Sequence, residues 1–571
     1  MNRNSRGVRR YDTPAPVSLP GRTWPDNRIT RAPRWLSTDL RDGNQSLAVP
    51  MDPARKRAMF DLLVGMGYKE IEVGFPVASQ DDHDFLRDLI EHDLIPGDVR
   101  ISVLTQARDD LIRRTVEALR GAPRANVHIY NATSPQFRDL VFGLTRDECK
   151  DMAVQAVGLM MKYADRTLAG TDLGFQYSPE LFNDTERDFS LEVCEAVMDV
   201  WEPGPGREII LNFPTTVERD TPNAFADQIE YLHRNLSRRE HVCLSVHPHN
   251  DRGTGVASAE LALMAGAQRI EGCLFGNGER AGNVDLVTLG MNMYSHGVDP
   301  GIDFSDLGRV RRTVERCNGL PVHPRHPYGG DLVFTAFSGS HQDAIKKGFD
   351  ALARQAHEAG LDPEELPWRV PYLPVDPADV GRTYEAVVRI NSQSGKGGVA
   401  YVLGAWHHLN IPRDLRVDFA RVVQRHTDAE GGEISPKRLG DLFHRVYTSA
   451  LPVPLAFPPG LVSAELHLDA GEFDVSGGRS DLVAALREEL LARGVEVRAV
   501  EWTAAEAGTT GRVAVYAHCH VGEHAVWGAG VELDATTAAL RAVSAAVGRS
   551  AWSLLSSATP RQRRASLVEH G

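Results

Sequence analysis

Cysteine is scarce and scattered in this chain. Its 571 residues include only six cysteines and no Cys-x-x-Cys pair. They are Cys149, Cys194, Cys243, Cys273, Cys317 and Cys519. Most of them fall inside apolar or helical runs, which favours buried thiols in a reducing compartment over disulfides.

The chain also lacks long hydrophobic runs and an excess of positive charge. No apolar stretch approaches the roughly 18 residues that a membrane-spanning helix needs. The formal net charge of -14 argues against nucleic acid as a main partner, because binding phosphates requires a basic face. The N-terminal arginines are not followed by the apolar region of a secretory signal. We therefore expect a cytoplasmic protein that binds neither membranes nor nucleic acid.

The length of 571 residues exceeds what one compact core accommodates, so several domains are expected. Proline and glycine clusters near residues 321–330 and 452–459 indicate linkers. The predicted divisions are an N-terminal arm at 1–30, a catalytic domain at 31–330, mostly helical linker subdomains at 331–452 and a regulatory domain at 453–571.

Short apolar runs alternate with amphipathic ones between residue 34 and about residue 300. Strands are expected to start near Trp35, Glu70, Val99, Ala125, Asp172, Glu208, His241 and Arg269. Helices are expected over Pro53–Met66, Asp81–Ile90, Asp110–Arg120, Arg146–Tyr163, Leu191–Val200, Ala224–Leu236, Val256–Ala265 and Val284–Tyr294. About eight strand–helix repeats predict an α/β fold with a closed (β/α)8 barrel, the TIM barrel.

His247 and His249 stand out at the end of the apolar run 242–246. Side chains two positions apart on a strand share a face, so the two imidazoles project together. Imidazoles paired with oxygen ligands suit a divalent metal ion. The alternative is that one histidine is structural and the other solvated.

The first and eighth strands, which are neighbours in a closed barrel, add oxygen ligands. Asp42 follows the first strand and Asn283 follows the eighth. Together with His247 and His249 they predict one ion with open positions, as in catalytic sites. A 2-oxo acid could chelate there, and Arg41 could stabilise a developing alkoxide. Arg41 and Asp42 could instead form a structural ion pair.

The region after residue 452 predicts a separate α+β module with two similar units of strands followed by a helix. The first unit is expected to have strands at 465–475 and 495–502 with a helix at 480–493 between them. The second is expected to have strands at 512–521 and 525–532 and a helix at 535–547. Such a module is typical of ligand sensing or of dimerisation.

Several motifs together resemble the α-isopropylmalate/homocitrate synthase family, most closely its long actinobacterial members. They are "STDLRDGNQSL" (37–47), "EVGFP" (72–76), "HIYNATS" (128–134), "NFPTTVE" (212–218), "HPHNDRGTG" (247–255) and "GCLFGNGERAGN" (272–283). The likeness continues in "FSGSHQDAIKKG" (337–348), "VPYLPVDPADVGR" (370–382) and "VWGAGVELDATTAALRAV" (526–543).

The resemblance implies a Claisen condensation of acetyl-CoA with 3-methyl-2-oxobutanoate, followed by thioester hydrolysis, that yields 2-isopropylmalate and CoA at the first committed step toward leucine. It also implies one divalent ion such as Mg²⁺, Mn²⁺ or Zn²⁺, an activating monovalent cation such as K⁺, a homodimer and inhibition by leucine.

The resemblance assigns roles to individual residues. Asp42, His247, His249 and Asn283 match the family's metal ligands, and Arg41, His128, Ser178 and Thr216 match residues around the oxo acid. Glu180 matches a catalytic carboxylate, and His341 and Tyr372 match catalytic groups that reach the partner subunit's barrel. Whether Glu180 or His341 takes the methyl proton stays open.

Two further sets of residues resemble ligand-binding turns. Gly276, Asn277, Gly278, Glu279 and Arg280 resemble the family's acetyl-CoA loop. Gly477, Gly478, Gly528, Gly530, Thr536 and Thr537 match the leucine-binding turns. The first of these turns departs from the family, because Arg479 stands where a glycine is usual.

Three other functions compete with this interpretation. Citramalate and homocitrate synthases would differ only around the side chain of the oxo acid. The related lyases carry a loop cysteine that is absent from 276–283, and they lack the C-terminal module. A non-catalytic leucine sensor would have lost a metal ligand or a base, and none is lost here.

Overall fold

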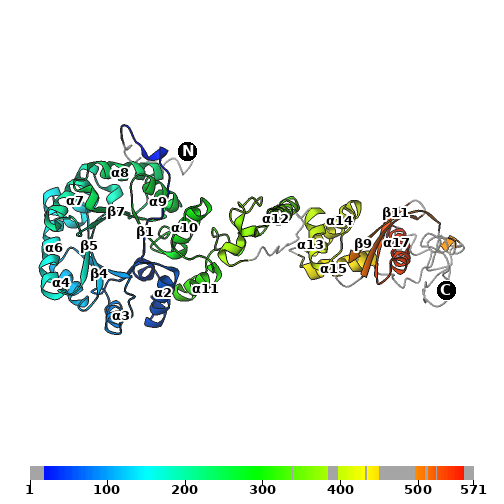
Figure 1. Ribbon diagram of the computed structural model, residues 1–571, viewed down its shortest axis with the longest axis horizontal. Helices are drawn as coiled ribbons and strands as arrows, with labels where there is room; N and C mark the ends of the chain where they lie inside the picture. The colour runs from blue at the N-terminus through cyan, green and yellow to red at the C-terminus, as the bar shows by residue number, and fades with distance from the viewer. Residues whose placement is uncertain are drawn as a thin grey trace, which may run out of the picture. The chain divides into compact units, whose positions relative to one another are not determined.

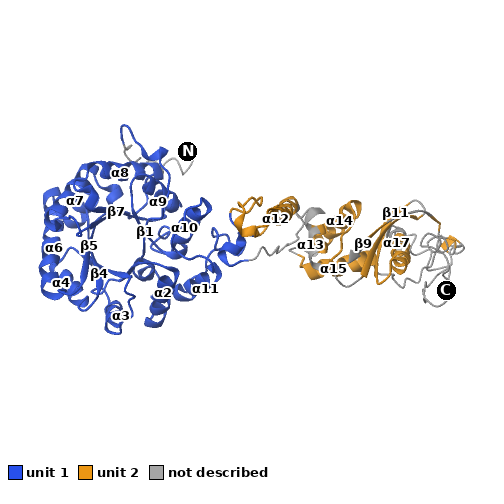
Figure 2. Ribbon diagram, in the orientation of Figure 1, with its two compact units in different colours: residues 1–334, 375–383 blue, residues 335–374, 384–571 orange. Residues whose placement is uncertain are grey.

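The computed structural model describes residues 18–336, 338–382, 396–430, 434–448, 488, 490–491, 496–507, 512–521 and 524–557. The chain divides into two compact units (Figure 2). Unit 1 comprises residues 1–334 and 375–383, and unit 2 comprises residues 335–374 and 384–571.

Unit 1 is a closed barrel of eight parallel strands in sequential order (Figure 1). The strands are β1 (Arg34–Ser37), β2 (Glu70–Gly74), β3 (Arg100–Gln106), β4 (Arg124–Ala132), β5 (Asp172–Glu180), β6 (Ile209–Thr215), β7 (Val242–Pro248) and β8 (Arg269–Gly272). The barrel closes where β1 pairs with β8, in register from Arg34 opposite Arg269 to Ser37 opposite Gly272. The predicted fold is confirmed.

Helices surround the barrel close to their predicted positions. They are α2 (Pro53–Met66), α3 (Gln80–Glu91), α4 (Asp109–Ala118), α5 (Pro135–Phe137), α6 (Arg146–Thr167), α7 (Arg187–Trp201), α8 (Pro222–Asn235), α9 (Gly255–Met264), α10 (Leu286–Ser295) and α11 (Leu307–Asn318). Local chemistry sets the ends of α2: Asp52 caps its first turn, and Gly67 ends it at a φ of 103°.

The predicted start of α10 at Val284 is wrong by two residues. The Val284 amide donates to the Pro248 carbonyl at 2.7 Å, and Asn283 forms an isolated bridge with His249. Asp285 then caps the helix by accepting from the Val287 amide. The extended backbone before α10 therefore holds Asn283 beside the end of β7.

Charged side chains fill part of the barrel interior. Arg269 and Glu271 are fully buried on β8, and Glu70 of β2 is 7% exposed. Arg269 donates to Glu70 at 2.7 Å and to Glu271 at 2.5 Å. Arg34 also donates to Glu70, at 2.8 Å. Buried charges of this kind are tolerated because each meets an opposite charge.

The described part of the N-terminal arm packs against α8. Trp24 is buried and donates through its indole Nε1 to Asp227 of α8 at 2.7 Å. The Thr23 amide donates to Glu230 of the same helix at 2.8 Å. These contacts fix the chain just before the barrel begins.

Unit 2 contains helices followed by a small sheet (Figure 1). Its elements are α12 (Gly339–Ala359), α13 (Lys396–His407), α14 (Arg413–Glu430), α15 (Pro436–Phe443), β9 (Val497–Ala507), β10 (Arg512–Val521), β11 (His524–Glu532) and α17 (Ala535–Ser557). The antiparallel sheet has the order β11-β10-β9. One face packs on α17 through Val515 and Ala542, and Tyr516 on the other face belongs to the core of α13–α15.

The sheet confirms the expected α+β module. The strand expected near residue 495 is β9, which pairs with β10. It was predicted in the first of the two similar strand–helix units, but it belongs to the same sheet as the strands of the second. The predicted strand at 465–475 and most of the predicted helix at 480–493 lie outside the described residues. Among the described helices, none combines the length and the apolar character that crossing a membrane requires.

Candidate metal centre and active site

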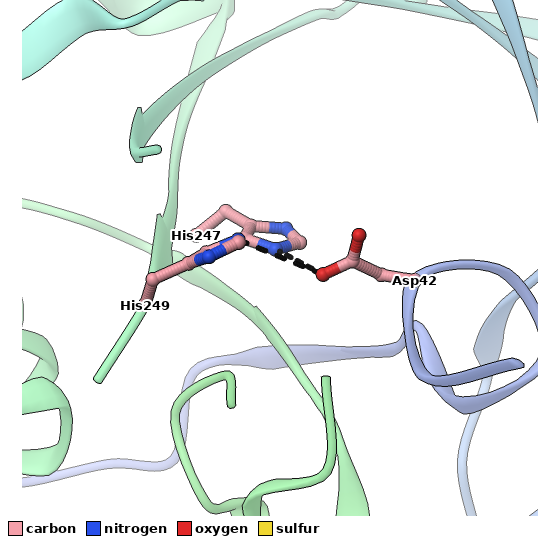
Figure 3. A group of neighbouring side chains, drawn as sticks. All are labelled: Asp42, His247 and His249. Carbon is pink, nitrogen blue, oxygen red and sulfur yellow. Dashed lines mark ion pairs between the residues drawn. The ribbon is translucent and has the colours of Figure 1, made fainter. Parts of the chain in front are cut away.

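Asp42, His247 and His249 meet at the carboxyl ends of the barrel strands (Figure 3). His247 lies on β7, His249 directly follows the strand, and Asp42 lies on the short helical turn Asp39–Gly43 after β1. The Nε2 atoms of His247 and His249 lie 3.5 and 3.6 Å from Asp42 Oδ2. All three residues are buried. This is the arrangement that a shared cation requires.

Two buried oxygens that accept no hydrogen bond make this site suitable for a cation. Asp42 Oδ2 and Asn283 Oδ1 are buried and accept no hydrogen bond within the protein. The Asn283 amide nitrogen donates to Cys273 Sγ at 3.3 Å, which fixes the identity of the remaining oxygen. A buried acceptor without a partner costs about 1–3 kcal/mol. Two imidazole nitrogens and two such oxygens match the ligands of a divalent ion.

The electrostatics of the three residues are strongly perturbed. Burial opposes charge on His247, but its contacts with Asp42 and Glu271 outweigh burial and raise its pKa to about 9. Burial and the charge of His247 lower the pKa of His249 to about 3. Burial also disfavours ionised Asp42, yet Arg41 and His247 hold its pKa well below the usual range. Asp42 is therefore a carboxylate at neutral pH.

Glu271 and Asp251 were not among the sequence-predicted site residues. His247 donates through Nδ1 to Glu271 Oε2 at 3.0 Å. Arg280 donates to His249 Nδ1 at 2.7 Å and pairs with Asp251 at 2.7 Å. The available signal for Glu271 was the pattern of β8, which places charged residues at 269 and 271 on one face of a buried strand.

The predicted oxo-acid residues lie beside the group formed by Asp42, His247 and His249. His128 Nε2 is 2.7 Å from Ser178 Oγ, and its Nδ1 is 2.7 Å from Glu72 Oε1. Arg41 pairs with Glu72 at 2.5 Å and with Asp42 at 2.7 Å. Glu72 thus connects Arg41 to His128.

A cavity of about 340 Å³ opens over these residues. Its lining contains the predicted residues Arg41, Asp42, His128, Ser178, Glu180, Thr216, His247, His249, Glu279 and Arg280. Burial raises the pKa of the Glu180 carboxyl, and the charge of Arg41 opposes that rise. The cavity can hold a small anionic substrate between a cation site and a carboxylate of raised pKa.

The predicted acetyl-CoA loop is tightly packed. Gly276 has a φ of 72° and Gly278 a φ of 157°. A Cβ at Gly278 would lie 2.8 Å from Asn283 Oδ1. Asn277 donates to the Gly43 carbonyl at 3.0 Å. These glycines let the loop approach Asn283, and Glu279 and Arg280 are the loop residues that reach the cavity.

His341 and Tyr372 lie together in unit 2. Their rings stack with centroids 4.0 Å apart and planes at 22°. Tyr372 is 62% exposed and has a φ of 64°, a left-handed backbone conformation that is uncommon for tyrosine. The structure brings these two side chains together at the surface of unit 2.

The predicted regulatory residues that are described have roles in packing. A Cβ at Gly528 or Gly530 would lie 2.0 Å from the Ala542 or Ala538 carbonyl oxygen, so both glycines let α17 approach β11. The amides of Thr536 and Thr537 donate to Asp534, which caps α17. Gly477 and Gly478 lie outside the described residues.

Known proteins match this chain over nearly its whole length. A 2-isopropylmalate synthase from Streptosporangium roseum is 70% identical over 554 residues, which cover 96% of each chain. The chain belongs to the 2-isopropylmalate synthase family. Further 2-isopropylmalate synthases from Thermobifida fusca and Parafrankia sp. are 58% and 55% identical, each alignment covering 95% of this chain and 97% of theirs.

Two family models agree with this membership. Residues 32–314 match the HMGL-like family, and residues 331–404 match the post-catalytic domain-like family of alpha-isopropylmalate synthase. The first match spans the barrel, and the second begins in the last residues of unit 1 and continues into unit 2. Membership of the 2-isopropylmalate synthase family confirms the expected enzyme class, an acyltransferase.

Proposed function

We propose that this chain condenses acetyl-CoA with 3-methyl-2-oxobutanoate and hydrolyses the thioester, which gives 2-isopropylmalate and CoA. The observation that carries the proposal is the group Asp42, His247 and His249 in the lining of the barrel cavity, in a chain 70% identical to a 2-isopropylmalate synthase. We assign catalysis to residues 31–330, with contributions from 331–452, and regulation to 453–571.

Asp42, His247, His249 and Asn283 would hold a divalent cation, Mg²⁺, Mn²⁺ or Zn²⁺, and K⁺ would act as an activator elsewhere. When bound, such an ion supplies Lewis acidity to an oxo group. The protein adds a fixed guanidinium, because Arg41 is held between Glu72 and Asp42. A preorganised cation of this kind stabilises negative charge that develops on oxygen.

Glu180 is proposed to take a methyl proton from acetyl-CoA. Its carboxyl lines the cavity, and its raised pKa makes it a better base than an exposed glutamate. The resulting carbon nucleophile adds to the keto carbon of the oxo acid, and water then cleaves the thioester. Ser178, His128 and Thr216 would orient the oxo acid, and Gly276–Arg280 would contact acetyl-CoA.

The cavity favours an oxo acid with an apolar side chain. Phe75, Leu104 and Pro214 line it. Both arginines of the lining are already paired, Arg41 with Glu72 and Arg280 with Asp251. A second carboxylate, as in 2-oxoglutarate, would therefore meet no unpaired guanidinium in this lining. This argues for 3-methyl-2-oxobutanoate over the substrate of a homocitrate synthase.

A panel of oxo acids tests the assignment. With acetyl-CoA and a divalent ion, 3-methyl-2-oxobutanoate is expected to exceed pyruvate by about tenfold or more in kcat/KM, since each buried methylene contributes about 1–3 kcal/mol. Release of free thiol measures the rate. Equal or higher rates with pyruvate would point to a citramalate synthase.

Repeating the assay with millimolar leucine tests the proposed feedback inhibition, and an unchanged rate would contradict it.

We also propose a homodimer in which His341 and Tyr372 act at the barrel of the partner chain. Variants His341→Ala and His249→Ala should each be inactive alone, and unfolding and refolding them as a mixture should restore activity. Random pairing in a two-fold dimer gives roughly a quarter of the wild-type rate. Thiol release after mixing measures the rescue. Mixed dimers that remain inactive would place each complete site within one chain.

A further inference from the structure

Glu271 lies between His247, a proposed metal ligand, and Gln176, which lies beside the oxo-acid residue His128. It is fully buried on β8. One carboxylate oxygen, Oε2, accepts from His247 Nδ1 at 3.0 Å. The other, Oε1, accepts from Arg269 at 2.5 Å and from Gln176 at 2.6 Å. Each oxygen therefore has a different set of donors.

The contact with His247 fixes the position of a proton. An ionised carboxylate can only accept hydrogen bonds. Nδ1 of His247, the nitrogen that contacts Glu271, must therefore carry a proton. Nε2, which lies 3.5 Å from Asp42 Oδ2, is then the nitrogen available for a cation. A histidine ligand generally depends on such a partner for its tautomer and its ring orientation.

The second oxygen connects Glu271 to the oxo-acid side of the cavity. Gln176 donates to Glu271 and lies 3.2 Å from His128 Nε2. Arg269 balances the carboxylate charge, and it also donates to Glu70 at 2.7 Å. Oε1 of Glu271 is thus held by Arg269 and Gln176, which fixes the direction in which Oε2 points toward His247.

We propose that Glu271 is a positioning residue that accepts the Nδ1–H of His247 and so directs Nε2 of the ring at the metal site. The inference rests on the proposed metal ligands and does not depend on which oxo acid is the substrate. Glu271 itself is not among the residues that line the cavity.

Glu271→Gln makes the proposal testable, because the network dictates how the new amide is oriented. Arg269 and Gln176 both donate to the Oε1 position, so the amide oxygen must take that place. The amide NH₂ then faces His247 Nδ1 and can only donate. Nδ1 must accept, and the imidazole proton moves to Nε2, where it competes with the cation.

Glu70→Gln is the matched control. Glu70 is the other buried carboxylate that pairs with Arg269, so this variant removes a similar charge from the same network. Among the described residues, the ion-pair partners of Glu70 are Arg269 and Arg34, and His247 is not one of them. A general loss of charge balance should therefore affect both variants alike, whereas the tautomer of His247 changes only in Glu271→Gln.

Calorimetric titration of each full-length, metal-free protein with Mn²⁺ alone, and separately with Zn²⁺ alone, measures the effect. Glu271→Gln should bind about 10–100-fold more weakly, the usual cost of losing such a partner, and Glu70→Gln should bind as the wild type does. With saturating metal, the KM for the oxo acid should be close to that of the wild type. Wild-type metal affinity in Glu271→Gln would overturn the inference.

Glu271→Asp covers the case in which the glutamine variant does not fold. It keeps the charge that neutralises Arg269, but its shorter side chain cannot reach both Arg269 and His247. Its metal affinity should fall in the same direction, and an unchanged affinity would also overturn the inference. Because the titration uses no substrate, a chain that lacks synthase activity but shows these affinities would refute the proposed function alone.

Discussion

Replacing His249 with alanine is expected to lower turnover by at least about a thousandfold, because a Lewis-acidic metal contributes several kcal/mol and each 1.36 kcal/mol corresponds to a factor of ten. His249 supplies one of the two imidazoles near Asp42 Oδ2, at 3.6 Å. Without it, the remaining His247, Asp42 and Asn283 form an incomplete ligand set. The bound ion should then be lost on dialysis.

Metal content, thiol release and circular dichroism of the same preparations check this prediction. The far-UV spectrum should match that of the wild type, since His249 lies at the rim of the barrel beyond the end of β7. His233→Ala is the control: His233 belongs to α8 on the outside of the barrel, and it should keep both metal and activity. A His249→Ala protein that retains one ion and normal turnover would place the metal elsewhere.

The sequence was sufficient to predict the barrel and the grouping of the four residues that we propose as metal ligands. Strand periodicity put His247 and His249 on one face, and barrel closure put the end of β1 beside the end of β8. Asp42 and Asn283 then had to approach the histidines, and in the structure Asp42 meets both of them while Asn283 bridges His249. These inferences succeed because topology alone determines which strand ends are neighbours.

The side-chain contacts that support the proposed metal ligands could not be predicted in the same way. The sequence of a four-residue buried strand does not indicate which side chain a glutamate contacts. The hydrogen bond between Glu271 and His247 therefore becomes evident only in the three-dimensional structure. The pattern of the glycines at 528 and 530 predicts a ligand turn, and it did not reveal that both glycines let α17 pack closely on β11. Side-chain pairing and helix packing depend on distances that periodicity does not specify.

Glu180→Gln is expected to lower kcat by about 10²–10⁴-fold, the usual contribution of a positioned base, while the metal stays bound. Glutamine preserves the shape of the side chain at the end of β5 but cannot accept a proton. Metal content equal to that of the wild type would separate this loss from that of His249→Ala. Asp184→Asn is the matched control, because burial also raises the pKa of Asp184 but it does not line the cavity.

The pH dependence of the activity should reflect the protonation of Glu180. Burial raises the pKa of Glu180 above that of an ordinary glutamate. The basic form is therefore present above that raised pKa and is lost as the pH falls through it. The wild-type kcat/KM should fall on the acid side at a pH above the usual carboxyl range, and the residual activity of Glu180→Gln should lack this limb. An acid limb that persists unchanged in the variant would assign the proton transfer to another group.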